Sequence, residues 1–363
     1  RGGIAAALLV AVTIGGLIGF YTARLADERD EARRAQIEAE QVSDFLIKLF
    51  KTSDPNQTKG EEVTARELLD RGAERVEEDL VEQPRVLGTM LDHIGSIYRT
   101  LANYPRAETI LTRALEVRTE ALGPEHPETL QSRRDLLELA RLQGSPLEGR
   151  LEEALELMEV SRRTLGGDHE DTLSSMGDLA RVHSAMGNYE EAATVYEDSL
   201  ERWLRTAGEE ESGTLWNMNN LAIAYKNLER YDDAREMYQR TLDIRTRLEG
   251  PDAPATLAVK LNYSNVLRRL GDEAAAASML EGALEDLPRV MGEMHPYTLG
   301  ARSNLGMVYL NQRRNDEAVA LYEETHARYV ELVGPDHNDA LAMRTNLAIA
   351  NRERGELDRA EEI

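Results

Sequence analysis

The chain has 363 residues, with 43 Lys and Arg against 67 Asp and Glu, which gives a formal net charge of −24. This excess of negative charge argues against a nucleic-acid-binding protein, because such a protein needs a basic surface to contact phosphate. The absence of cysteine excludes zinc fingers, disulfide scaffolds and thiol catalysis, whereas 41% hydrophobic residues are sufficient for a packed core. Because the sequence starts at Arg1 and ends inside a helical pattern at Ile363, we expect it to be a fragment of a longer protein.

An uncharged segment opens the chain. Residues 2–23 carry no charged side chain and would extend about 33 Å as a helix, at about 1.5 Å per residue, which is enough to cross a bilayer. The alternative is a secretory signal, whose apolar part is usually shorter. We therefore expect a transmembrane helix at 1–23, with the membrane contacted through residues 2–23.

Small residues recur every fourth position within this segment, and they could let a second helix approach closely. They are Ala7, Ala11, Gly15 and Gly19. The stripe predicts a homodimer, although Ala and Gly are also simply common in membrane helices.

Residues 24–51 predict a juxtamembrane helix that carries apolar residues seven apart, as in a coiled coil. These are Leu25, Ala32, Ala39 and Leu46. A single solvated helix ending at Phe50 fits the same residues. Residues 52–62 contain Pro, Ser and Gly and predict a linker, and residues 63–85 predict an amphipathic helix that caps the first repeat.

A repeat of 42 or 43 residues fills the remainder of the chain. The dipeptide Thr-Leu marks it, beginning at Thr129, Thr172, Thr214, Thr256 and Thr298, with Ala340 in the sixth place. A turn that starts with Gly precedes each of these dipeptides, as in Gly123-Pro124. Gly favours the end of one helix and Pro the first turn of the next, so each unit is predicted to be a helix pair.

Small residues at fixed points of both helices predict a close crossing within each pair. The first helix carries Gly95, Ala180, Ala222, Ser264, Gly306 and Ala348, and the second carries Ala107, Ala192, Ala234, Ala276, Ala318 and Ala360. In the second repeat the segment from Gln143 to Arg150 predicts a turn about five residues longer than the others, followed by a shortened stretch after Ala154.

This pattern resembles the tetratricopeptide repeat, in the 42-residue form seen in kinesin light chains, for example in Asn220-Leu221-Ala222-Ile223-Ala224-Tyr225. The resemblance implies an all-α fold, an α-solenoid of antiparallel helix pairs over residues 86–363 with six full repeats and a truncated seventh. It also implies a module that binds proteins.

We expect no catalytic, cofactor-binding or metal-binding residues in this chain. Four histidines occupy equivalent turns, but equivalent positions in adjacent repeats should lie about 8–10 Å apart, too far for one metal ion. They are His126, His169, His295 and His337, and we give them a structural role. The sequence contains no phosphate-binding Gly loop, Walker lysine or nucleophile elbow, so we expect the chain itself not to be an enzyme.

In the family that the repeat resembles, the first helices line a concave groove. The resemblance implies that Asn220, Asn262, Asn304 and Asn346 hold the backbone of an extended peptide there. The alternative is that these amides bridge neighbouring repeats. One turn along stands a row of basic residues, which favours an acidic peptide or carboxyl terminus as the partner. The row consists of Arg99, Arg141, Lys226, Arg268 and Arg352.

The order of segments resembles the C-terminal part of bacterial membrane-anchored serine/threonine protein kinases. The residues that carry the likeness are Asp44-Phe45-Leu46, Ser53-Asp54-Pro55 and residues 63–73. The resemblance implies a kinase domain before Arg1, which would bind ATP and Mg²⁺, and a location in the bacterial inner membrane. Two alternatives remain: the interaction tail of a signalling ATPase or transcriptional regulator, and a stand-alone membrane-anchored scaffold.

The side of the membrane on which the repeats lie stays open. The kinase family places its repeats outside the cytoplasm, whereas the basic residues that directly follow the uncharged segment favour the cytoplasmic side. These residues are Arg24, Arg29, Arg33 and Arg34.

Overall fold

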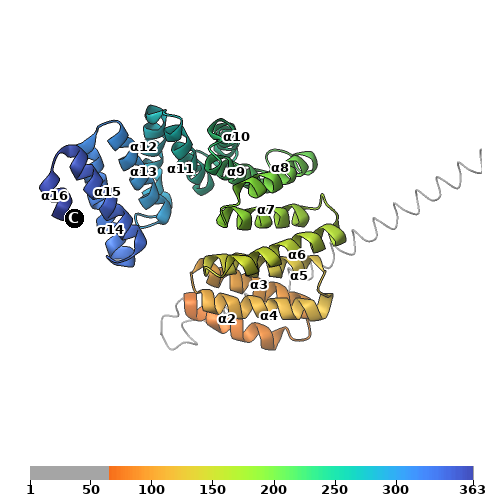
Figure 1. Cartoon of the computed structure of the whole chain (residues 1–363). Helices are drawn as coiled ribbons and strands as arrows, with labels where there is room; N and C mark the ends of the chain where they lie inside the picture. Colours follow the sequence, from red (N-terminus) through yellow and green to blue (C-terminus); the bar gives the residue numbers. More distant parts are fainter. Residues whose placement is uncertain (1–64, 363) are drawn as a thin grey trace, which may run out of the picture. The chain divides into compact units, whose positions relative to one another are not determined.

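The computed structural model describes residues 65–362, which fold into α-helices without any strand (Figure 1). The predicted all-α class is therefore confirmed for this part of the chain. The expectations for 1–23, 24–51 and 52–62 lie outside the described residues. Within 65–362, no helix combines the length and the apolar character needed to span a membrane.

The helices follow one another at short intervals. They are α2 (Ala65–Asp79), α3 (Pro84–Thr100), α4 (Tyr104–Leu122), α5 (Pro127–Leu142), α6 (Leu147–Leu165), α7 (Glu170–Ala185), α8 (Tyr189–Thr206), α9 (Ser212–Asn227), α10 (Tyr231–Glu249), α11 (Pro254–Arg269), α12 (Glu273–Val290), α13 (Pro296–Asn311), α14 (Asn315–Val333), α15 (Asn338–Arg354) and α16 (Leu357–Glu362). They belong to two compact units, one that ends at Ser145 and one that begins at Pro146.

In the first unit, α2 packs on α3, α3 on α4 and α4 on α5. Ala73 and Val76 of α2, with Leu80 just after the helix, join Leu91 and Tyr98 of α3 in one buried cluster. Helix α2 thus covers α3 from the segment 63–85, for which the sequence predicts an amphipathic capping helix. The helix is shorter than the predicted 63–85, because α3 already begins at Pro84.

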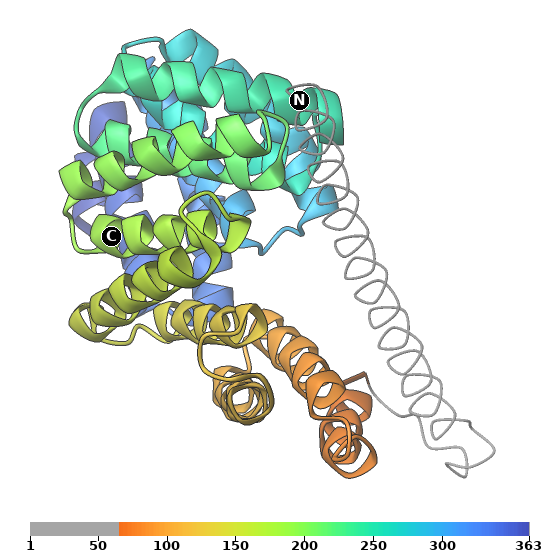
Figure 2. The same ribbon diagram turned by 90° about the vertical axis from the view of Figure 1, so that its right-hand side faces the viewer.

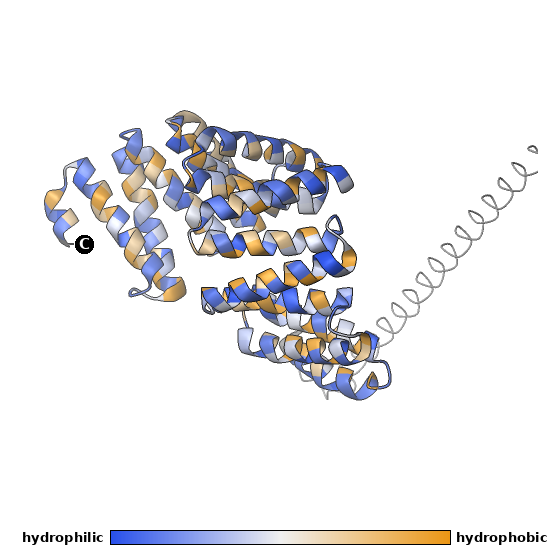
Figure 3. Cartoon of the chain, turned by 45° about the vertical axis from the view of Figure 1, so that its right-hand side comes forward, coloured by the Kyte–Doolittle hydropathy of each residue, from blue (hydrophilic) through white to orange (hydrophobic). Residues whose placement is uncertain are grey.

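In the second unit, each helix from α6 to α16 packs against the next (Figures 1 and 2). The alanines of the second helices, such as Ala192, Ala234 and Ala318, are completely buried, as the predicted close crossings require. Hydrophobic and hydrophilic residues alternate along the helices (Figure 3), because each helix has one face in the core and another in water.

The Thr-Leu marker has a specific role at the start of the first helices. The buried hydroxyls of Thr129, Thr172, Thr214 and Thr298 each donate to the carbonyl of the turn glycine six residues earlier, at 2.7–2.8 Å. Nearby, Nδ1 of the four turn histidines accepts the backbone N–H two residues ahead, at 3.1–3.3 Å. These histidines therefore act as N-caps of α5, α7, α13 and α15.

The predicted long turn in the second repeat is wrong. Helix α6 begins at Leu147, so the turn covers only residues 143–146, one residue more than the corresponding turn between α7 and α8. With this register, Arg150 occupies the alanine position of Ala192, and Ala154 occupies the position of Tyr196. The predicted start of the second helix was too late, because the sequence has the buried Arg150 where the repeat pattern calls for alanine.

Candidate protein-interaction surface

Four first helices of the second unit carry the predicted asparagines at the same place. Asn220 of α9, Asn262 of α11, Asn304 of α13 and Asn346 of α15 each stand eight residues after the first residue of their helix. We call these four residues the amide row. All four side chains are half-buried, so each has some contact with solvent while being held against neighbouring residues.

The amides of the row differ in their hydrogen bonds. Asn220 donates through Nδ2 to the carbonyl of Trp216 on its own helix at 2.8 Å. Asn262 donates through Nδ2 to Oδ1 of Asn219, across from α11 to α9, at 3.4 Å. Asn304 and Asn346 form no side-chain hydrogen bond with any residue in 65–362. Asn262 therefore bridges neighbouring repeats, whereas the amides of Asn304 and Asn346 keep all their donors and acceptors for a ligand.

The predicted basic row is partly neutralised. Arg99 lies 3.7 Å from Asp135, Arg141 lies 2.7 Å from Glu138, and Arg352 lies 3.3 Å from Glu353. Lys226 and Arg268, by contrast, have no carboxylate partner among the described residues. Arg99 and Arg141 belong to the first unit, whereas the amide row belongs to the second, so these two arginines are not assigned to the surface that carries the amide row. Of the five predicted residues, only Lys226 and Arg268 remain without a carboxylate partner in residues 65–362, each six residues after an asparagine of the amide row on the same helix.

Arg269, which follows Arg268 at the end of α11, was not among the predicted residues. Burial lowers the pKa of the Lys226 ammonium, and repulsion from the Arg269 guanidinium lowers it further. Lys226 and Arg269 therefore lie close enough to repel each other. A single helix does not reveal this pairing, because it depends on the register between α9 and α11.

An aromatic site at the α7 end was also missed. Asp178 occupies the amide-row position on α7 and lies 2.7 Å from Arg181, whose guanidinium stands 5.8 Å from the ring centroid of Trp216. Trp216 packs closely over α7 because Gly177 has no side chain: a Cβ there would lie 2.6 Å from the indole ring. The charges on α7 are thus paired, and the ring of Trp216 is half-buried beside them.

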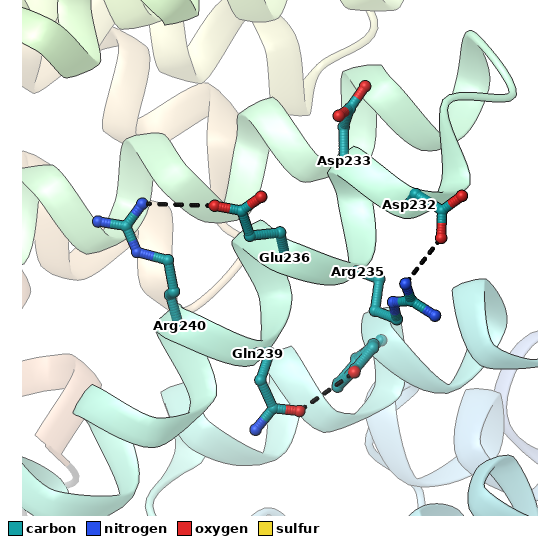
Figure 4. A pocket seen from close by; sticks show the side chains of 7 residues that line it. Asp232, Asp233, Arg235, Glu236, Gln239 and Arg240 are labelled. Carbon is teal, nitrogen blue, oxygen red and sulfur yellow. Dashed lines mark hydrogen bonds and ion pairs between the residues drawn. The ribbon is translucent and has the colours of Figure 1, made fainter.

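A depression of about 560 Å³ lies on α10, bordered by Tyr263 of α11 (Figure 4). Its charged residues are paired, partly with residues outside the lining: Asp233 lies 2.7 Å from Arg230, and Arg240 lies 2.7 Å from Glu209. Arg235 lies 2.8 Å from Asp232, Arg240 reaches Glu236 at 4.0 Å, and the Tyr263 hydroxyl donates to Gln239 at 3.1 Å. The depression therefore offers little unpaired charge for a ligand. Among residues 65–362, no cluster of His, Asp and Glu has the arrangement of a metal site.

Comparison with known proteins agrees with this geometry. The tetratricopeptide repeat family matches the chain over residues 86–157, 147–205, 211–288 and 297–363, which together make up more than half of it. The chain belongs to the tetratricopeptide repeat family. No curated protein matches the sequence.

Solved structures show the same fold at low sequence identity. BtubC from P. vanneervenii is 22% identical, with a TM-score of 0.52 over 60% of this chain and 88% of that protein. Kinesin-light-chain-like repeats from Podosopora anserina are 23% identical, with a TM-score of 0.50 over 58% of this chain and 99% of theirs. A signal transduction ATPase from Pyrococcus horikoshii with a tetratricopeptide repeat sensor is 16% identical, with a TM-score of 0.55 over 86% of this chain and 50% of that one.

Proposed function

We propose that this interaction scaffold binds an extended segment of a partner protein along the first helices of its second unit. Tetratricopeptide repeats generally mediate protein–protein binding, and the amide row gives this surface a matching chemistry. The observation that carries the proposal is that Asn304 and Asn346 stand at equivalent positions, half-buried, without a side-chain hydrogen bond to any described residue. An amide offers both donors and an acceptor, so it can bind peptide backbone whatever the side chains are.

The partner segment is acidic in this proposal. The chain as a whole carries −24, so an acidic segment is repelled over most of its surface. Lys226 and Arg268 adjoin the amide row without carboxylate partners among residues 65–362, so they supply a local attraction. This attraction weakens with salt, because half-exposed charges are screened.

The test uses the full chain and a bead-bound library of random nine-residue peptides. Peptides retained by the unmodified chain are measured against Asn346→Ala, and against Asn338→Ala as a matched control at the exposed start of the same helix. Loss of one peptide-backbone hydrogen bond should weaken binding about three- to tenfold for Asn346→Ala and leave Asn338→Ala unchanged. If replacing all four asparagines of the amide row by alanine left every retained peptide bound as before, the proposed surface would be wrong.

We also propose, from the sequence of residues 1–73, that the scaffold is anchored in a membrane and regulates a serine/threonine kinase. The uncharged segment 2–23 supports the anchor, and the order of segments supports the kinase. The sensor-bearing ATPase among the similar folds favours the rival reading, a signalling ATPase with this array as its sensor. The coding sequence upstream of Arg1 separates them: kinase motifs support the first reading, and a Walker loop supports the second.

A further inference from the structure

Helices α9 and α11 have a fixed register on the face that carries the amide row. They run parallel, because each is followed by an antiparallel second helix, and they contact each other directly (Figure 1). The bond from Asn262 to Asn219 marks one point of this contact. Seven residues further along both helices, two turns or about 10 Å, stand Lys226 and Arg269. The same register therefore places these two residues on facing turns of the two helices, where the Arg269 charge acts on Lys226.

Arg268 precedes Arg269 in the last turn of α11, so three cations, Lys226, Arg268 and Arg269, stand at the same end of the two helices. We call this group the cationic cluster. The charge of Arg268 also acts on Tyr322 of α14. Lys226 and Arg268 are half-buried and Arg269 is exposed. Among residues 65–362, none of the three has an ion pair or a side-chain hydrogen bond. Repulsion from Arg269 acts on Lys226, and no carboxylate offsets it.

Several other arginines of the second unit lie beside carboxylates, although isolated ones such as Arg344 do not. Arg230, Arg240, Arg289 and Arg314 each have at least two carboxylate neighbours within 4.0 Å. A helix C-terminus attracts a cation, which explains one basic residue at the end of each helix. It does not explain why cations from two helices meet without a carboxylate in a chain of net charge −24. Such a site is incomplete until an anion occupies it.

The geometry points to a phosphorylated side chain as the anion that occupies the cationic cluster. This inference rests on the proposed peptide-binding function and specifies the partner segment. A phosphate monoester carries between −1.5 and −2 charges at neutral pH and three strong acceptor oxygens, enough to engage three cations. A single carboxylate would leave most of the positive charge uncompensated. Arginine guanidinium groups also match phosphate with paired N–H donors, and lysine binds it as a point charge.

The position of the cluster fits this ligand. The Asn219–Asn262 contact lies about 10 Å away on the same two helices, a distance that three or four residues of extended peptide can cover at up to about 3.5 Å each. One segment can therefore place its backbone on the amide row and a phosphorylated side chain on the cluster.

The experiment uses three nine-residue peptide libraries with the same random flanks and a central phosphoserine, glutamate or serine. Binding of each library to the full chain is measured, with inorganic phosphate as competitor. We expect the phosphoserine library to bind at least tenfold more tightly than either other library, which corresponds to about 1.4 kcal/mol. Inorganic phosphate should compete only weakly, because it lacks the backbone that the amide row holds.

Substitutions in the cationic cluster test whether the preference for phosphoserine depends on these three residues. Lys226→Gln combined with Arg268→Gln and Arg269→Gln should abolish the preference for phosphoserine, so that the phosphoserine and serine libraries bind with equal affinity. Arg344→Gln is the control, because Arg344 is an exposed arginine of α15 without an ion pair among the described residues. Far-ultraviolet circular dichroism and melting temperature confirm that the triple variant folds.

The outcomes separate the two proposals. Equal binding of the phosphoserine and glutamate libraries, or a preference that survives the triple variant, would overturn the phosphate site while peptide binding stands. Displacement by inorganic phosphate at concentrations equal to those of the library would show a site for free phosphate and also overturn the inference. If no library bound at all, the peptide-binding function itself would fail.

Discussion

Two chemically identical substitutions should change the stability of this chain in opposite directions. Thr298 and Thr256 are both completely buried at the start of a first helix. The Thr298 hydroxyl donates to the Gly292 carbonyl at 2.8 Å, whereas the Thr256 hydroxyl has no hydrogen-bond partner among residues 65–362. Replacing Thr by Val removes the hydroxyl and keeps the branched shape.

The structure sets the sign and size of each effect. Thr298→Val leaves the Gly292 carbonyl with only the longer bond from the His295 N–H, at 3.3 Å, and the hydrogen bond that is lost contributes about 0.5–1.5 kcal/mol. Thr256→Val removes a buried hydroxyl that is unpaired, and an unpaired polar group costs a similar amount to keep buried. We therefore expect Thr298→Val to destabilise α13 locally by about 1 kcal/mol, and Thr256→Val to stabilise α11 by about 1 kcal/mol.

Amide hydrogen exchange of the full chain measures these changes locally, which matters because a repeat array does not always unfold in one step. A change of about 1 kcal/mol corresponds to about a fivefold change in the equilibrium between closed and open forms. Exchange should become faster in the first turns of α13 for Thr298→Val and slower in those of α11 for Thr256→Val. Equal destabilisation by both substitutions would refute this account of the turns.

Three further predictions concern single residues. Ala253 stands at the N-cap of α11 without a side-chain bond, where α5, α7, α13 and α15 have histidine, so Ala253→Ser should raise the local stability by about 1 kcal/mol in hydrogen exchange. Ala102 adopts a φ of 55° in the turn between α3 and α4, so Ala102→Gly should stabilise the first unit by about 1 kcal/mol in urea unfolding, whereas Gly144→Ala, at a φ of 70°, should destabilise it. Burial, followed by the hydrogen bond to Glu197, raises the pKa of the Tyr225 hydroxyl to about 12. Because the unfolded chain releases this proton near pH 10, the contribution of Tyr225 to the free energy of unfolding is complete below pH 10 and should be lost as the pH rises towards 12. The pKa of Tyr225 is measured as the difference between the absorbance titrations at 295 nm of the unmodified chain and of Tyr225→Phe.

The repeat could be predicted in detail because its residues act locally. The turn glycine with the buried threonine six residues later and the histidine N-caps are interactions within one turn, so their spacing is visible in the sequence. The alanines of the close crossings are equally local, because any larger side chain would separate the helices. These features fix the helix pairs and their register wherever the pattern holds.

The remaining features depend on packing between helices. In the second repeat, Arg150 and Ala154 hide the start of α6, because the expected small and large residues are exchanged along the helix. Arg99 and Arg352 look like part of one basic row, yet carboxylates that the sequence pattern does not connect with them neutralise both. Conversely, the meeting of Lys226 with Arg269 depends on the lateral register of α9 and α11, which no single helix encodes.

Photo-crosslinking tests the central claim, that the first-helix face of the second unit binds the partner segment, most directly. Because the chain has no cysteine, Asn304→Cys and Ala320→Cys each introduce a unique site for a benzophenone maleimide label. Asn304 belongs to the amide row, and Ala320 is exposed on α14. Peptides retained from the random library should crosslink to the label at position 304 and not to the label at position 320. Crosslinks at position 320 with none at position 304 would contradict the claim.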